Sequence, residues 1–186
     1  MYLPRPVLGR HNGRTERMAK VNTPQELFIA LLSNVMRREE KLSDILTQIA
    51  GNAQDDDIKE ALASREFVRE QQVMTLQRCF KLLGAQPTEP ETRLHEIFVE
   101  DFKKQAAAIE GPVARRLFVL AKINNLMRLH ANEYAVLTAM ADFTNNYGVA
   151  VLLEACQATN DALANRARDA IRSTVRERIA ERRAGK

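Results

Sequence analysis

Apolar side chains recur every three or four residues along five stretches of the chain, a spacing that places them on one face of an α-helix. The first stretch begins at Thr23, where Thr, Pro and Glu are spaced as in a helix cap, and ends at Gly51 and Asn52. Its apolar positions are Phe28, Leu31, Val35, Leu42, Ile45 and Ile49. Arg38 and Glu39 interrupt this series, so the predicted core face carries charge near its middle.

A second helix is predicted after three aspartates, Asp55 to Asp57, whose negative charges suit the positive end of a helix. Gly84 and Pro87 end it. Its apolar positions are Ile58, Leu62, Leu76 and Phe80, and the polar residues that interrupt them are Arg65, Arg69 and Gln72. This core face is therefore also broken by charge near its middle.

The next two predicted helices are joined by a short connection near Gly111 and Pro112. The third begins after a second capping sequence, Thr88 to Glu91, and its apolar face consists of Leu94, Ile97, Phe98 and Phe102. The fourth ends at the Asn-rich stretch 144–148, and its apolar positions are Leu117, Leu120, Ile123, Leu129, Val136, Met140 and Phe143.

The last predicted helix starts near Val149 and continues toward Arg183. About 35 residues at about 1.5 Å each give it a length of about 50 Å, against roughly 40 Å for the first two helices. We therefore expect its end to project. Because the projecting part keeps an apolar stripe, we interpret the stripe as a packed arm or a dimer contact, with a solvated tail as the alternative. The stripe consists of Ile171, Val175 and Ile179.

These patterns predict an all-α protein: an up-and-down four-helix bundle plus a long C-terminal helix, in one domain spanning residues 21–186. Gly and Pro are few and stand near the ends of the periodic stretches. Residues 1–20 have no apolar period and are expected to form a flexible basic arm. The longest apolar runs are too short for a membrane span, so we expect a cytoplasmic protein. Cys79 and Cys156 are expected to be buried free thiols.

Charge is distributed unevenly along the chain. Residues 1–20 carry a net charge of +4 and residues 165–186 carry +5, so the rest of the chain carries −5. An arginine-rich helix end could contact phosphate groups, and nucleic acid is a candidate partner. The residues concerned are Arg172, Arg176, Arg182 and Arg183. The alternative is a solvated face on which Glu177 and Glu181 pair with the arginines.

Three stretches narrow the choice among helical bundles: Thr23 to Leu42 (TPQELFIALLSNVMRREEKL), Val73 to Pro87 (ending in FKLLGAQP) and Arg128 to Gly148 (RLHANEYAVLTAMADFTNNYG). In order and spacing they resemble the corresponding segments of the YciF-like family of ferritin-like bacterial stress proteins. The resemblance spans about residues 23–165. It implies a ferritin-like bundle whose helices can hold two metal ions.

Most of the metal ligands implied by this resemblance are replaced in the present chain. Glu39 occupies the place of the family's glutamate on the first helix. On the second helix, Arg65 and Val68 stand where the family has a His and a Glu. Glu96 matches the carboxylate of the third helix, and the fourth helix has His130 and Glu133 in place of Glu-His-x-Glu. In the last helix, only Asp161 keeps an acidic charge of the family's acidic run.

A two-metal carboxylate site needs bridging glutamates and Glu-x-x-His sequences, and this chain contains no Glu-x-x-His. Four residues remain candidate ligands for a single iron or manganese ion: Glu39, Glu96, His130 and Glu133. Arg65, however, would bring a permanent positive charge to the level of the metal. Our hypothesis is therefore that Glu39 and Arg65 form an ion pair in place of the metal, and we expect no cofactor.

The sequence offers no nucleophilic triad and no glycine-rich phosphate loop, so hydrolase and kinase activities have no support. We expect a non-catalytic structural or interaction module, associated with stress through the family resemblance alone, that forms a homodimer. One alternative is a metal-binding oxidoreductase of oxidative-stress protection, using the four candidate ligands. A second is non-specific nucleic-acid binding through the basic ends of the chain.

Overall fold

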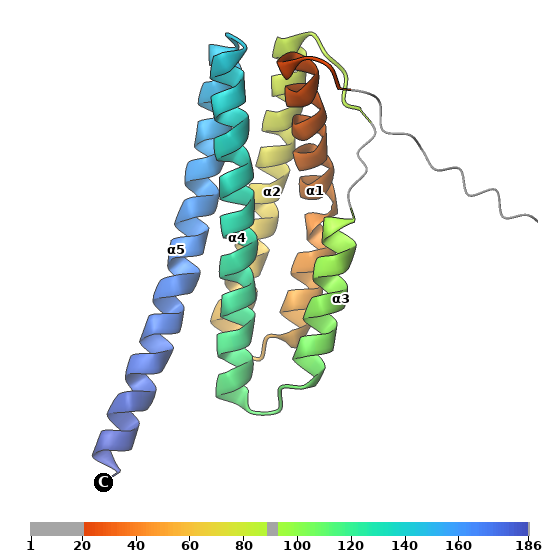
Figure 1. Ribbon diagram of the computed structural model, residues 1–186. Helices are drawn as coiled ribbons and strands as arrows, with labels where there is room; N and C mark the ends of the chain where they lie inside the picture. Colours follow the sequence, from red (N-terminus) through yellow and green to blue (C-terminus); the bar gives the residue numbers. More distant parts are fainter. Residues whose placement is uncertain (1–20, 89–92, 186) are drawn as a thin grey trace, which may run out of the picture.

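The computed structural model describes residues 21–88 and 93–185, and these residues form five α-helices with no β-strand among them. The helices are α1 (Pro24–Asn52), α2 (Asp56–Leu83), α3 (Leu94–Ala107), α4 (Pro112–Phe143) and α5 (Tyr147–Ala184). Successive helices run in opposite directions (Figure 1). The all-α prediction is confirmed. The predicted basic arm, residues 1–20, and residues 89–91 of the second capping sequence lie outside the described residues.

Local signals in the sequence set the two ends of the first hairpin. Thr23 Oγ1 accepts a hydrogen bond from the Glu26 backbone N–H at 3.1 Å, and Glu26 Oε2 accepts one from the Thr23 backbone N–H at 3.3 Å. This capping box satisfies donors that the first turn leaves free. At the other end, Gly84 has a φ of 60°, a left-handed conformation that favours glycine, and it stops α2.

The four long helices surround the core, and the short helix α3 lies against α1 and α4 (Figure 1). This arrangement differs from the predicted one, in which the C-terminal helix was an addition to a four-helix bundle. Here α5 is one of the four core helices, because its first half packs along α4. The buried residues of that half are Val149, Ala150, Leu153, Cys156, Asn160, Ala164 and Ala167. The appended helix is α3.

The buried face of α4 was predicted incorrectly in part. Val136 and Phe143 are 53% and 73% exposed, although both were expected to face the core. The face that is buried consists of Val119, Leu120, Leu126, Met127, His130, Ala131, Tyr134, Leu137 and Ala141. Because α4 has apolar residues around most of its circumference, the three- and four-residue spacing does not select a single face. In α3, likewise, Ile97 is 56% exposed.

The core has two apolar clusters separated by a polar layer. The first cluster includes Leu42 and Ile49 of α1, Leu62 of α2 and Met127 of α4. The second includes Phe28 and Val35 of α1, Leu76 of α2, Tyr134 of α4 and Leu153 of α5. Between them each long helix contributes buried polar residues, and we call this set the polar layer: Glu39, Arg65, Gln72, His130 and Asn160.

The final turns of α5 extend away from the other helices (Figure 1). With 38 residues, α5 is about 57 Å long. All residues from 175 to 185 are exposed, including Val175 and Ile179 of the apolar stripe at 42% and 45%. In the part of the chain that the structure describes, no helix combines the length and the apolar character that crossing a membrane requires.

Candidate functional site

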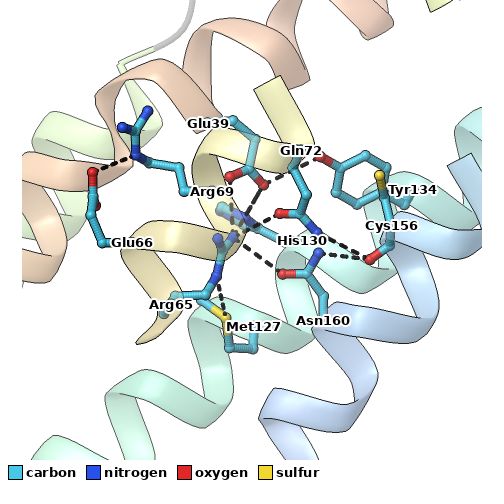
Figure 2. A network of polar contacts seen from close by, with 10 residues as sticks. All are labelled: Glu39, Arg65, Glu66, Arg69, Gln72, Met127, His130, Tyr134, Cys156 and Asn160. Atoms are coloured by element: carbon cyan, nitrogen blue, oxygen red, sulfur yellow. Dashed lines mark hydrogen bonds and ion pairs between the residues drawn. The ribbon is translucent and has the colours of Figure 1, made fainter. Parts of the chain in front are cut away.

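A buried carboxylate and a buried guanidinium meet at the centre of the bundle. Arg65 Nη2 on α2 lies 3.1 Å from Glu39 Oε2 and 3.3 Å from Glu39 Oε1 on α1. The exposed fraction is 0% for Glu39 and 2% for Arg65, so water does not screen the pair. Figure 2 shows the two side chains pointing toward each other from neighbouring helices. The structure thus brings together the two residues that the sequence hypothesis paired.

The guanidinium of Arg65 is held by three further residues. Its Nη2 also donates to Gln72 Oε1 at 3.0 Å and to Asn160 Oδ1 at 3.4 Å, and its Nε donates to Met127 Sδ at 3.3 Å. The amide nitrogens of Gln72 and Asn160 both donate to the backbone carbonyl of Cys156, at 3.3 and 2.9 Å (Figure 2). These amides are therefore fixed in orientation, and the arginine has one defined position.

The carboxylate of Glu39 has two partners on α4. His130 Nδ1 lies 3.1 Å from Glu39 Oε1, and the Tyr134 hydroxyl donates to the same oxygen at 3.3 Å. Burial alone would raise the pKa of Glu39, but the electrostatic influence and hydrogen bonds of His130 and Arg65 lower it to about 2. Burial also raises the pKa of Tyr134 well above its usual value, and the charge of Glu39 adds to this effect. Glu39 is thus held as a carboxylate.

A second ion pair lies near the polar layer, between α1 and α4. Arg38 Nη2 is 2.5 Å from Glu133 Oε1, and both side chains are mostly buried, with exposed fractions of 10% and 20%. Burial raises the pKa of Glu133, and Arg38 opposes this rise. The second carboxylate proposed as a metal ligand therefore also has an arginine partner.

The four candidate metal ligands do not all converge, although His130 and Glu39 are in contact at 3.1 Å. Glu96 is 53% exposed on α3 and pairs with Arg93, whereas Glu39 and Glu133 are bonded to arginines. Across residues 21–88 and 93–185, no group of three or more His, Cys, Asp or Glu side chains is close enough to hold a metal ion. Because a metal pair needs several carboxylates free to bind it, the donors present do not fit the two-metal site that the sequence resemblance implies.

The four arginines proposed as phosphate contacts are all exposed along the final part of α5. Arg172 pairs with Asp169 at 3.6 Å. Arg176, Arg182 and Arg183 form no ion pair with any residue that the structure describes. The two glutamates expected to neutralise them have other partners: Glu181 pairs with Arg178, and Glu177 accepts a hydrogen bond from Ser173.

Sequence reasoning missed four members of the site. Asn160 and Tyr134 were not singled out, Gln72 was noted only as a break in an apolar face, and Arg38 was not paired with Glu133. The signal that could have identified them is that each long helix has a polar residue at a core position. When the helices are arranged antiparallel, these polar residues lie at similar levels along the bundle axis. That signal identifies the layer but does not specify which side chains bond.

Comparison with protein families gives one match, and it covers most of the chain. The family described as Domain of unknown function (DUF892) matches residues 23–180. The chain belongs to the DUF892 family. Among curated proteins, none matches the sequence significantly. Membership thus rests on a sequence match over the five helices, and the family's description names no activity.

Solved structures include proteins whose fold is similar to that of this DUF892 chain. It is similar to the Escherichia coli stress protein YciF, with a TM-score of 0.79 and 16% identity over 84% of this chain and 99% of that one. It is also similar to YcfI from Rhodopseudomonas palustris, with a TM-score of 0.76 and 16% identity over 82% and 97%. A Xanthomonas campestris protein matches with a TM-score of 0.62 and 15% identity over 87% and 99%. The YciF-like resemblance is therefore confirmed.

Proposed function

We propose that this protein is a non-catalytic, ferritin-like structural or interaction module in which an arginine takes the place of the metal. The observation that carries the proposal is the contact of Arg65 Nη2 with both oxygens of Glu39, at 3.1 and 3.3 Å. An arginine stays protonated under all ordinary conditions. The central carboxylate is therefore neutralised by a side chain that is covalently part of the protein. A metal ion, by contrast, can dissociate.

Electrostatics supports this reading of the centre. A divalent cation beside Glu39 would lie within a few ångströms of the Arg65 charge, in surroundings where burial weakens screening. The arginine's other contacts, to Gln72 and Asn160, hold it there. A metal would thus have to displace a charge that several side chains fix in position.

We infer the stress association from the relatives of this chain and the cellular location from its cysteines. YciF is described as a stress protein, and the Rhodopseudomonas protein is provisionally described as structural. We infer a related role for this chain from the shared family.

Cys79 and Cys156 are both buried free thiols, and free thiols are typical of proteins in the reducing cytoplasm.

Elemental analysis of the untagged protein, produced with added iron and manganese, tests the metal-free proposal. We expect far less than one metal ion per chain. Near-stoichiometric iron or manganese that disappears in both Glu39→Ala and Glu133→Ala would overturn the proposal. It would support the oxidoreductase alternative instead.

The projecting part of α5 is the interaction surface that we propose, and a second copy of the chain is its partner. Val175 and Ile179 are about half exposed, and with Val113 and Leu117 of α4 they line a groove of about 500 Å³. Pairing of two such stripes would remove apolar surface from water on both copies.

The solution mass tests the dimer. Val175→Glu and Ile179→Glu together should convert a dimer into a monomer, because they place four charges in the paired stripe. Ala180→Glu is the control, since it adds one negative charge per chain to the same exposed stretch, beside the stripe and not within it. A monomeric unmodified protein, or a dimer that the double variant leaves intact, would exclude this interface.

A further inference from the structure

Four arginines in the second half of α5 lie along one side of the helix. We call this set the arginine face: Arg168, Arg172, Arg176 and Arg183. They are spaced four or seven residues apart, and side chains at these spacings share a side of an α-helix. All four are exposed. At about 1.5 Å per residue, the row is about 22 Å long. The structure therefore presents these charges to solvent as a line.

Arg182 does not belong to the arginine face, although the sequence grouped it with Arg183. Consecutive residues of an α-helix point about 100° apart. Arg182 lines the groove between α4 and α5, together with Val113 and Arg178. Arg168 was not singled out from the sequence, and it extends the row by one further helical turn. The structure thus sorts the arginines of α5 into a groove side and an outer side.

The charges of the arginine face are poorly neutralised by other side chains. Arg168, Arg176 and Arg183 form no ion pair with any residue that the structure describes. Arg172 lies 3.6 Å from Asp169, but both side chains are more than half exposed, at 60% and 66%. Water screens such a surface pair, so it is worth little. The face can therefore exchange this contact for a stronger external anion.

The neighbouring part of α4 supplies no acidic residue either. Arg116 Nε donates to Thr174 Oγ1 at 3.1 Å, which shows that the first half of α4 lies alongside this part of α5. Residues 112–132 of α4 contain no Asp or Glu. Asp161, which continues the arginine face toward the start of α5, is paired with Arg128 at 2.5 Å. The positive potential of the face is therefore reinforced by its surroundings.

The shape and chemistry of the row favour duplex nucleic acid as its partner. The planar guanidinium group of arginine matches the oxygens of a phosphate. Each DNA strand carries one phosphate per about 3.4 Å of helix axis, so a row of about 22 Å runs beside about six of them. Single strands are held by stacking on aromatic side chains. Residues 165–186 contain no aromatic residue, which favours a double strand.

An anionic membrane surface fits this helix less well. Helices that lie in a membrane interface bury a face rich in Trp, Phe or Leu. Residues 165–186 contain none of these three residue types. In the projecting stretch, residues 175–185, the only apolar side chains larger than alanine are Val175 and Ile179. The end of α5 has the charge that would attract lipid headgroups but not the apolar face that would insert.

We propose that the arginine face binds the phosphate backbone of double-stranded DNA without regard to base sequence. Contacts to phosphate position a protein on the duplex but carry no sequence information. This binding is a function beyond the structural role proposed above. It does not depend on the dimer, because each chain carries the complete face.

Fluorescence anisotropy of a labelled DNA duplex tests the proposal on the unmodified full-length protein. Each phosphate that the protein neutralises lowers the slope of log K against log salt by about 0.9, so four contacts give a slope of about −3.6. Raising the salt from about 50 to about 200 mM should therefore weaken binding about a hundred-fold. Two duplexes of unrelated sequence should bind equally well, and a single strand should bind more weakly.

Variants of the face locate the binding site. Replacing all four arginines of the face by glutamine should abolish the binding measured at about 50 mM salt, and Arg176→Gln alone should make the slope shallower by about 0.9. A control variant removes the same number of positive charges from exposed positions of α2 and α3 and should retain most of the binding. Its substitutions are Arg78→Gln, Lys81→Gln, Lys103→Gln and Lys104→Gln. Circular dichroism checks that both variants keep their helix content.

Several results would overturn the proposal. One is that the unmodified protein does not bind the duplex at about 50 mM salt, or binds it without the salt dependence. Another is an equal loss in the control variant, which would mean that net charge alone matters. Tighter binding to vesicles of phosphatidylserine and phosphatidylcholine than to DNA would assign the face to a membrane. A monomeric protein that binds DNA as expected would exclude the dimer proposed above and leave this inference intact.

Discussion

Arg65 and Glu39 depend on each other because neither has water to solvate it. Removing one partner from a buried pair leaves a charge without compensation, which costs about 3–5 kcal/mol. We expect Glu39→Ala and Arg65→Ala each to lower the free energy of unfolding by about this amount. The double variant should lose less than the sum of the two losses. Urea unfolding of all four proteins gives the coupling energy.

An exposed pair within α1 supplies the control for this cycle. Arg37 and Glu40 are 3.1 Å apart, with side-chain exposures of 51% and 35%. Removing either residue should change the free energy of unfolding by less than about 1 kcal/mol, because water screens the pair. If the losses at Glu39 and Arg65 were additive, the two side chains would not interact in solution.

Acid should weaken the folded state through Glu39. Its pKa is about 2 in the folded protein and 4.5 ordinarily, so the folded form binds fewer protons than the unfolded form between these values. The stabilisation is fully present above pH 4.5 and is lost as the pH falls toward 2. The shift corresponds to about 3 kcal/mol. Unfolding free energies measured from pH 7 to pH 2 should show this decline.

Comparison with the Glu39→Gln variant separates the pH-dependent contribution of Glu39 from the contributions of the other titratable groups. The difference in stability between the two proteins should narrow as the pH falls from 4.5 to 2, since only the unmodified protein loses the carboxylate. Glu133, whose pKa is raised, has the opposite tendency, because its contribution is lost as the pH rises. It is present in both proteins. A constant difference over this range would contradict the role assigned to Glu39.

The sequence predicted the central charges of the site but not its amides. Arg65 and Glu39 interrupt otherwise apolar helical faces, and a charge at such a position requires a counter-charge. Asn160 gives no such signal, since a neutral amide is common on solvated faces. Its burial follows from where α5 packs, which the local pattern does not determine.

At the scale of the helix, Gly84 is a position where a side chain would strain the backbone. Its φ of 60° is rarely adopted by residues other than glycine and asparagine, although no atom would obstruct an added Cβ. Gly84→Ala should therefore lower the free energy of unfolding by about 1 kcal/mol. Thermal or urea unfolding measures the change.

Gly148 is the contrasting position for this test. It lies in the first turn of α5 without a positive φ, and no atom lies within 4 Å of the place that an alanine Cβ would occupy. Gly148→Ala should stabilise the protein by about 0.4–1 kcal/mol, because alanine restricts the unfolded chain more than glycine does. A stabilising Gly84→Ala would show that the end of α2 adapts to another conformation.

Helix ends were more predictable than helix faces. The capping box at Thr23 and Glu26 and the glycine at position 84 are short-range signals, and the structure has α1 beginning and α2 ending there. The face of α4 depends instead on its neighbours. The polar His130 is buried because it faces α1, where it contacts Glu39, whereas the apolar Val136 is exposed.

For the whole molecule, the end of α5 should contribute to assembly more than to folding. Every residue from 175 to 185 is exposed, so removing residues 176–186 should lower the free energy of unfolding by less than about 1 kcal/mol. The same truncation should leave a monomer, which light scattering can measure. Loss of cooperative unfolding would instead show that this segment belongs to the folded core.

The position of the polar layer between two apolar clusters constrains how the helices slide past one another. A shift of one helix along its neighbour by a single turn, about 5.4 Å, would exchange one leucine contact for another at little cost. The same shift would carry Arg65 away from Glu39 and leave both charges among aliphatic side chains. The polar layer therefore fixes the axial register of the helices, selecting one register among several that the apolar residues alone would allow.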